Sequence, residues 1–149
     1  MSCLKRPESK RLSQFSFSSQ LIIQLINSTC SFIDTYHIRW WESVETICFP
    51  SILTRVIESN ASRNSQVTCA GLRGLKFCIQ QFLHPDQVLL ISGATDSTLN
   101  DAAKVVSLCL VSVHWEVRDS ALEVVTEMAQ LSQKSILFKG VQRSPFKLC

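Results

Sequence analysis

The chain has 149 residues, 46% of them hydrophobic and 18% charged, with a formal net charge of +3. This length and apolar share are ordinary for a globular domain with its own core. The charge is uneven, since residues 1–12 carry +3, residues 134–149 carry +4 and the part between them carries −4. We therefore predict a disordered basic N-terminus (1–12), a folded body (13–133) and an irregular basic tail (134–149).

The seven cysteines argue against a disulfide framework or a zinc site, because their number is odd and no C-x-x-C pair occurs. Most of them stand in apolar helical runs, where free thiols behave as small hydrophobic side chains. The three histidines, His37, His84 and His114, are isolated from one another in the sequence. We predict no metal-ligating residue and no cofactor.

The first predicted helix spans residues 13–34. Residues 13–33 carry no charge, but 11 of these 21 positions are Ser, Thr, Asn or Gln. The segment is therefore too polar for a membrane span, and we expect no contact with a membrane. An apolar stripe at helical spacing is expected to face inward. It consists of Phe15, Ile22, Leu25, Ile26, Thr29 and Ile33.

Two further helices are predicted over residues 38–59 and 65–83, separated by the polar turn "SNASRNS". Pro50 lies inside the first of them and should kink or split it. The expected inner face of that helix consists of Trp41, Val44, Ile47 or Cys48, Ile52, Val56 and Ile57. The expected inner face of the helix over 65–83 consists of Val67, Ala70, Leu75, Cys78, Ile79 and Phe82.

After a short segment begun by Pro85, two more helices are predicted over residues 98–112 and 114–133. The last helix has apolar residues at the spacing of an amphipathic helix. They are Val117, Ala121, Val124, Val125 and Met128. Arg118 stands beside this stripe and could donate to backbone carbonyls or to Asp96 or Asp101 of a neighbouring unit.

An internal repeat relates the third and the last helix at an offset of 50 residues. Val67 then aligns with Val117, Ala70 with Ser120 and Leu75 with Val125. A two-helix unit of this length is near the upper end for HEAT and armadillo repeats. The predicted fold is therefore all-α, an α-α superhelix of HEAT/armadillo-type helical hairpins with about five to six helices.

The stretch "HWEVRDSALE", in which Trp115 to Glu123 are the matching residues, resembles a run in one family. This is the family of the HEAT-repeat activator protein associated with the breast-cancer susceptibility protein and the ataxia-telangiectasia kinase. The resemblance implies that the chain is a fragment or short isoform of the central repeat region of such a protein. The resemblance implies a non-enzymatic scaffold of the nucleus and cytoplasm that acts in the DNA damage response. It also implies protein partners, namely the damage-signalling kinase and the endonuclease subunits of the Integrator complex.

For several single residues and short motifs, a role in binding or catalysis is less favoured than a role in helix packing or on the solvated surface. Trp40, Trp41 and Trp115 could stack on bases, but packing in the core and between repeats is favoured. The "GLRG" at 71–74 has the form of a KH-domain loop, but helix packing is favoured. The acidic run of Glu116, Asp119, Glu123 and Glu127 should form a solvated flank of the last helix.

No catalytic, cofactor-binding or metal-ligating residue is predicted, since no motif of an enzyme class occurs. The leading hypothesis is a protein-binding scaffold. The alternative is a nucleic-acid-associated helical protein that uses its basic ends, and a steep salt dependence of binding would distinguish it. Uncapped apolar faces at both ends of a short repeat array also predict poor solubility or self-association of the isolated chain.

Overall fold

The computed structural model describes residues 8–37, 49–82 and 94–143, with side chains for 18–37, 49–81 and 100–133. These parts of the chain form five α-helices and contain no strand, which confirms the all-α class. The helices are α1 (Glu8–Thr35), α2 (Phe49–Asn60), α3 (Ser65–Phe82), α4 (Ala94–Leu110) and α5 (Trp115–Arg143). Side chains of both basic ends lie outside the described residues, as do Trp40 and Trp41.

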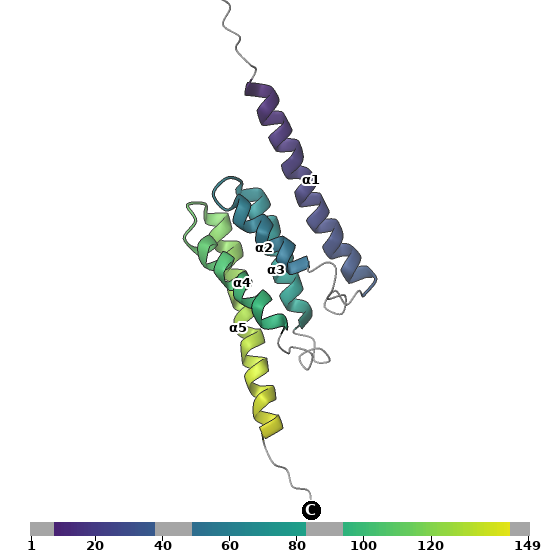
Figure 1. The fold of residues 1–149 in the computed structure, drawn as a ribbon, viewed down its shortest axis with the longest axis vertical. Coiled ribbons are helices and arrows are strands. Elements are labelled where there is room, and N and C mark those ends of the chain that lie inside the picture. Colours follow the sequence, from purple (N-terminus) through teal and green to yellow (C-terminus); the bar gives the residue numbers. More distant parts are fainter. Residues whose placement is uncertain (1–7, 38–48, 83–93, 144–149) are drawn as a thin grey trace, which may run out of the picture.

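The helices form two hairpins and one additional helix (Figure 1). The hairpin of α2 and α3 packs against the hairpin of α4 and α5, through contacts of α3 with α5 and of α2 with α4. α1 packs on α3. The turns that connect the paired helices lie at the same end of the molecule, so α1, α3 and α5 run in parallel (Figure 1). The result is two layers, with α3 at the centre of the three-helix layer.

Pro50 lies in the first turn of α2. It is the second residue of α2 and is buried. A proline fits the first turn, because the backbone N–H that it lacks would have no partner within the helix there. The sequence predicted a kink or a split at Pro50, and α2 begins at Phe49, the residue before it. Residues 38–48, which the sequence assigned to the same helix, lie outside the described residues.

The polar turn between α2 and α3 ends in a helix cap. Ala61 N donates to Ile57 O at 2.8 Å, and Asn64 N donates to Asn60 O at 2.9 Å. The Asn64 side chain then accepts a hydrogen bond from Val67 N at 3.1 Å. This arrangement satisfies a free donor at the start of α3. The turn predicted between these two helices is confirmed.

The core is continuous across the two hairpins and α1. Leu53 and Ile57 of α2 are fully buried against α3, from which Leu72 and Leu75 also enter the core. The predicted inner residues of α3 for which side chains are described are all at most 3% exposed. These are Val67, Ala70, Leu75, Cys78 and Ile79. Leu53 and Leu72 belong to the core although the sequence pattern did not single them out.

The helices at the two ends of the described chain extend further than the sequence pattern predicted, and α4 also begins earlier, at Ala94. α1 begins at Glu8, directly after Pro7, and α5 continues past Gln133 to Arg143. Gly140 does not end α5, since one glycine in a helix costs only about 1 kcal/mol. The helix stops two residues before Pro145, which could not continue it. Both extensions project beyond the packed hairpins (Figure 1).

On the side of α3 and α5 that faces the other helix of the same hairpin, residues 50 positions apart are buried alike. α3 begins at Ser65 and α5 at Trp115. Val67 and Val117 are both fully buried, and Gly71 and Ala121 are both buried small residues. The equivalence fails on another side, since Leu75 is 1% exposed and Val125 is 39% exposed. This difference locates a face of α5 that no described helix covers.

Candidate functional site

The acidic run of α5 forms a polar seam with α3. Lys76 Nζ donates to Glu123 Oε2 at 2.7 Å, and Gln80 Nε2 donates to Glu127 Oε1 at 2.9 Å. The bond to Glu123 raises the pKa of Lys76, because it favours the charged amine. The solvated flank predicted for these residues is therefore only part of their role. Two of the four carboxylates hold neighbouring helices together.

The described cysteines are packing residues. Cys30, Cys69, Cys78 and Cys109 carry reduced thiols, and the last two are buried. Burial disfavours the thiolate and, with a smaller contribution from Cys69, raises the pKa of Cys109 to about 11. A thiol with this pKa is a poor nucleophile at neutral pH. Within the described ranges no three His, Cys, Asp or Glu residues gather as they would around a metal ion.

The "GLRG" segment lies inside α3 and serves helix packing, as predicted. Both of its glycines are buried. A Cβ atom on Gly71 would stand 2.6 Å from Ile57 Cγ1, closer than carbon atoms approach. Gly71 thus allows α2 to approach α3 closely. A nucleic-acid-binding loop is not formed here.

Arg118 bonds within its own hairpin. Its Nη1 donates to the carbonyl of Ser112 at 2.7 Å. The predicted acceptor type, a backbone carbonyl, is confirmed, but its place in a neighbouring unit is wrong. Asp101 instead lies 3.3 Å from Lys104 Nζ, one turn along α4, and the Asp96 side chain lies outside the described residues. Arg118 therefore fastens the start of α5 to the turn before it.

Trp115 is exposed, which corrects the prediction that it packs between repeats. It is 65% exposed at the first residue of α5, where none of the described helices covers it. Val111 and Val113, in the turn before it, are 78% and 88% exposed. We call these three residues the turn cluster. The two valines were missed in the sequence, although apolar residues in a turn of otherwise polar character are a detectable signal.

A second exposed apolar surface runs along α5. Leu122 is 56% exposed and Val125 is 39% exposed, and Arg118 and Ala129 are also exposed. These positions are three or four residues apart, so they share one side of the helix. We call them the α5 stripe. The polar seam with α3 lies on another side of α5, which leaves the stripe facing away from the stack.

The outer helix at the other end of the stack has a similar surface. Its exposed apolar residues follow a spacing of about four and seven residues and form the α1 stripe. The stripe consists of Leu21, Leu25, Phe32 and Tyr36. Leu25 was predicted to face inward and is 58% exposed, whereas Ile26 and Ile33 of the same predicted set are buried. The spacing of Leu21, Leu25 and Phe32 could have indicated this second apolar side.

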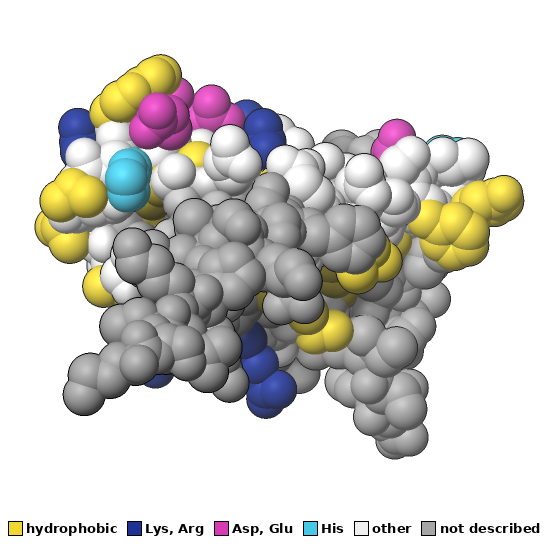
Figure 2. Space-filling model, turned by 90° about the horizontal axis from the view of Figure 1, so that it is seen from above, with side chains coloured by type: hydrophobic (Ala, Val, Ile, Leu, Met, Phe, Trp, Pro, Cys, Tyr) yellow, Lys and Arg dark blue, Asp and Glu magenta, His cyan; other side chains and the backbone are white. Residues whose placement is uncertain are grey.

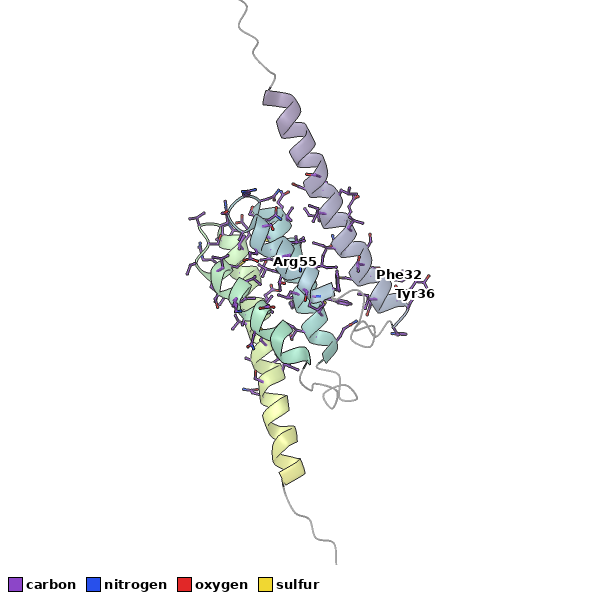
Figure 3. All side chains as sticks on the ribbon, viewed as in Figure 1. Phe32, Tyr36 and Arg55 are labelled. Atoms are coloured by element: carbon purple, nitrogen blue, oxygen red, sulfur yellow. The ribbon has the colours of Figure 1, made fainter. Side chains whose placement is uncertain are left out.

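Phe32 and Tyr36 lie together at the C-terminal end of α1 (Figure 3). Their ring centroids are 4.6 Å apart, and both rings border an open hollow of about 540 Å³ lined by residues of α1 and by Tyr36, which directly follows this helix. Hydrophobic side chains also gather at two opposite edges of the face drawn in Figure 2. Among the described residues, the large exposed apolar side chains are therefore those of the α1 stripe, the α5 stripe and the turn cluster, together with Ile52 of α2 and Leu108 of α4.

Comparisons of the chain with models of known protein families, with characterised proteins and with solved structures find no match. None of the helices in the described parts has the length and apolar character needed to cross a bilayer. The geometry of the exposed apolar surfaces is therefore the main guide to function.

Proposed function

We propose that the chain is a non-enzymatic helical-repeat scaffold of HEAT type that mediates protein–protein interaction. The observation that carries this proposal is the turn cluster. Val111, Val113 and Trp115 remain exposed on a turn that the Arg118–Ser112 bond holds in place. Exposed apolar clusters are typical of protein-binding sites, and tryptophan is enriched among the residues that dominate binding energy.

The family resemblance supplies the proposed partners. The run from Trp115 to Glu123 begins inside the turn cluster and continues along α5. On this basis we propose binding to the endonuclease subunits of Integrator and to the damage-signalling kinase, in the nucleus and cytoplasm. The stacked hairpins with a 50-residue offset support the proposal, because arrays of such units form extended binding surfaces.

Proximity labelling in cells tests the proposal with the turn cluster altered. Val113→Asp places a charge in the cluster, and Ser62→Asp places the same charge in the equivalent turn between α2 and α3. We expect the wild-type chain and Ser62→Asp to label Integrator endonuclease subunits or the kinase, and Val113→Asp to lose that labelling. Since Val113 is 88% exposed, its replacement should leave the thermal unfolding curve unchanged.

Two results would overturn the proposal. Labelling of neither the Integrator subunits nor the kinase by the wild-type chain would reject the partners. Equal labelling by the wild-type chain and Val113→Asp would reject the turn cluster as the binding site.

A further inference from the structure

Comparison of α5 with α3, its equivalent 50 residues earlier, indicates which kind of element would pack on the α5 stripe. Fifty residues before Arg118, Leu122 and Val125 stand Thr68, Leu72 and Leu75 of α3. These α3 residues are at most 1% exposed, whereas their α5 counterparts are exposed. Leu122 and Val125 are thus apolar like Leu72 and Leu75 but remain exposed, while the third pair replaces Thr68 by the charged Arg118.

The covering element on α3 is identified by the polar seam. Leu72 lies one helical turn before Lys76, and Lys76 contacts Glu123 of α5. This side of α3 is thus the side on which α5, a parallel helix, packs. By the same geometry, Leu122 lies on the side of α5 where one more parallel helix would continue the stack.

α1 has the properties that this position requires. It runs parallel to α3 and α5, and the α1 stripe is exposed at the opposite end of the same layer (Figure 1). Residues 13–33, which include Leu21, Leu25 and Phe32 of the α1 stripe, carry no charge, so packing this stretch on the α5 stripe would desolvate no unpaired charge from it. Arg118, the one charged member of the α5 stripe, already donates to the Ser112 carbonyl.

We propose that the chain associates head to tail, with the α1 stripe of one copy packed on the α5 stripe of the next. The added helix continues the order α1, α3, α5 into the α1 of the second copy. Because the two joined surfaces differ, each pair leaves one free stripe of each kind, and assembly does not stop at a dimer. The proposal goes beyond partner binding, since it requires no other protein and does not use Val111 or Val113.

Complementation between two variants tests this arrangement. Leu25→Asp disables the α1 stripe and Leu122→Asp disables the α5 stripe. Leu108→Asp is the matched control, since Leu108 is a 49% exposed leucine of α4 outside both stripes. The mass of the 149-residue chain is measured by light scattering after size exclusion over a wide range of concentration, for each protein alone and for an equal mixture of the two stripe variants.

We expect the masses of the wild-type chain and Leu108→Asp to rise with concentration beyond that of a dimer. Leu25→Asp and Leu122→Asp should each stay monomeric, and their mixture should form a dimer and nothing larger. Both replaced leucines are more than half exposed, so the variants should keep their helical circular dichroism. If either does not, Leu25→Gln and Leu122→Gln replace the pair.

Three outcomes would overturn the proposal. They are a monomeric wild-type chain at all concentrations, a mixture that stays monomeric, and association lost in Leu122→Asp but kept in Leu25→Asp. The last outcome would indicate a symmetric contact of two α5 stripes. None of them bears on the labelling of other proteins through the turn cluster, so failure here and failure of the scaffold proposal are distinguishable.

Discussion

Side-chain volume at one repeated position sets how closely the paired helices approach. Gly71 of the first hairpin and Ala121 of the second stand 50 residues apart, and both are buried. At Gly71 the space for a methyl group is filled by Ile57, whose Cγ1 would be 2.6 Å from an added Cβ. Gly74, one turn later, is less restricted, because its nearest neighbours would be 3.1 to 3.2 Å away at the ends of Ile26 and Leu53.

Gly71→Ala should lower the free energy of unfolding by about 1 kcal/mol. Overpacking costs about 1–3 kcal/mol, and the better helix propensity of alanine returns about 1 kcal/mol. In an Ile57→Ala background the obstructing Cγ1 is absent, so the same change should be neutral or stabilising. Urea unfolding of the four proteins measures this coupling, with Gly74→Ala as a control of small effect. An equal cost of Gly71→Ala in both backgrounds would contradict the contact with Ile57.

Cys109 should make stability depend on pH in the alkaline range. Its pKa is about 11 in the folded chain, against 9.0 for an unperturbed thiol, so between these values the folded state keeps a proton that the unfolded state releases. Raising the pH through this window therefore lowers the free energy of unfolding, by roughly 2–3 kcal/mol for this group. Below pH 9.0 the effect is absent.

The variant Cys109→Ala isolates this contribution from other groups that titrate in the same range. Its unfolding free energy should fall less than that of the wild-type chain between neutral pH and about pH 11. Denaturant unfolding at both pH values gives the two differences. Identical pH dependence of the two proteins would mean that Cys109 ionises in the folded chain as it does in the unfolded one.

At the scale of the elements, local signals predicted α3 and the start of α5 closely. The turn of Ser, Asn and Arg before Ser65 and the apolar spacing from Val67 onward were sufficient, because caps and periodicity are properties of neighbouring residues. The burial of Leu53 was missed, since it depends on which side of α2 meets α3. Only the tertiary contacts determine which side of α2 is buried.

The exposure of Trp115 and Leu25 was missed for a related reason. Both residues lie on apolar sides of their helices, and the sequence pattern does not tell how many helices surround each one. α1 and α5 contact α3 from its two sides, so each has a side that no described helix covers. The sequence predicted that both side chains would be packed against other helices, whereas the structure leaves them exposed.

Asn64 connects two elements, and its loss should affect both. Its Oδ1 accepts from Val67 N, and its Nδ2 donates to Ser19 Oγ of α1 at 2.8 Å. Asn64→Ala should lower the free energy of unfolding by about 1–2 kcal/mol, because it removes a helix cap and a partly buried hydrogen bond. Asn64→Asp keeps the capping oxygen and should cost less. Chemical denaturation ranks the three proteins, and an Ala variant as stable as the wild type would show that the cap contributes nothing.

At the scale of the whole molecule, α3 is the shared support of the fold. It is the helix that contacts α1, α2 and α5, and its residues from Val67 to Ile79 supply much of the common core. α1 by contrast packs mainly on α3, and its N-terminal part projects beyond the hairpins (Figure 1). A helix supported on several sides opens only when the whole core opens, whereas a helix held on one side can detach alone.

Amide hydrogen exchange should therefore divide the described helices by their support. We expect the slowest exchange in α3, at the rate set by global unfolding, and faster exchange in α1, whose exposed leucines and rings contribute little to the core. Measured at low concentration, where copies do not associate, the amides of α1 should open with a smaller free energy than those of α3. At high concentration the head-to-tail contact covers both the α1 stripe and the α5 stripe, and it should slow exchange in these two helices more than in α2 or α4. Equal protection of α1 and α3 in the dilute sample would mean that the stack unfolds as one unit, with α1 as firmly held as its centre.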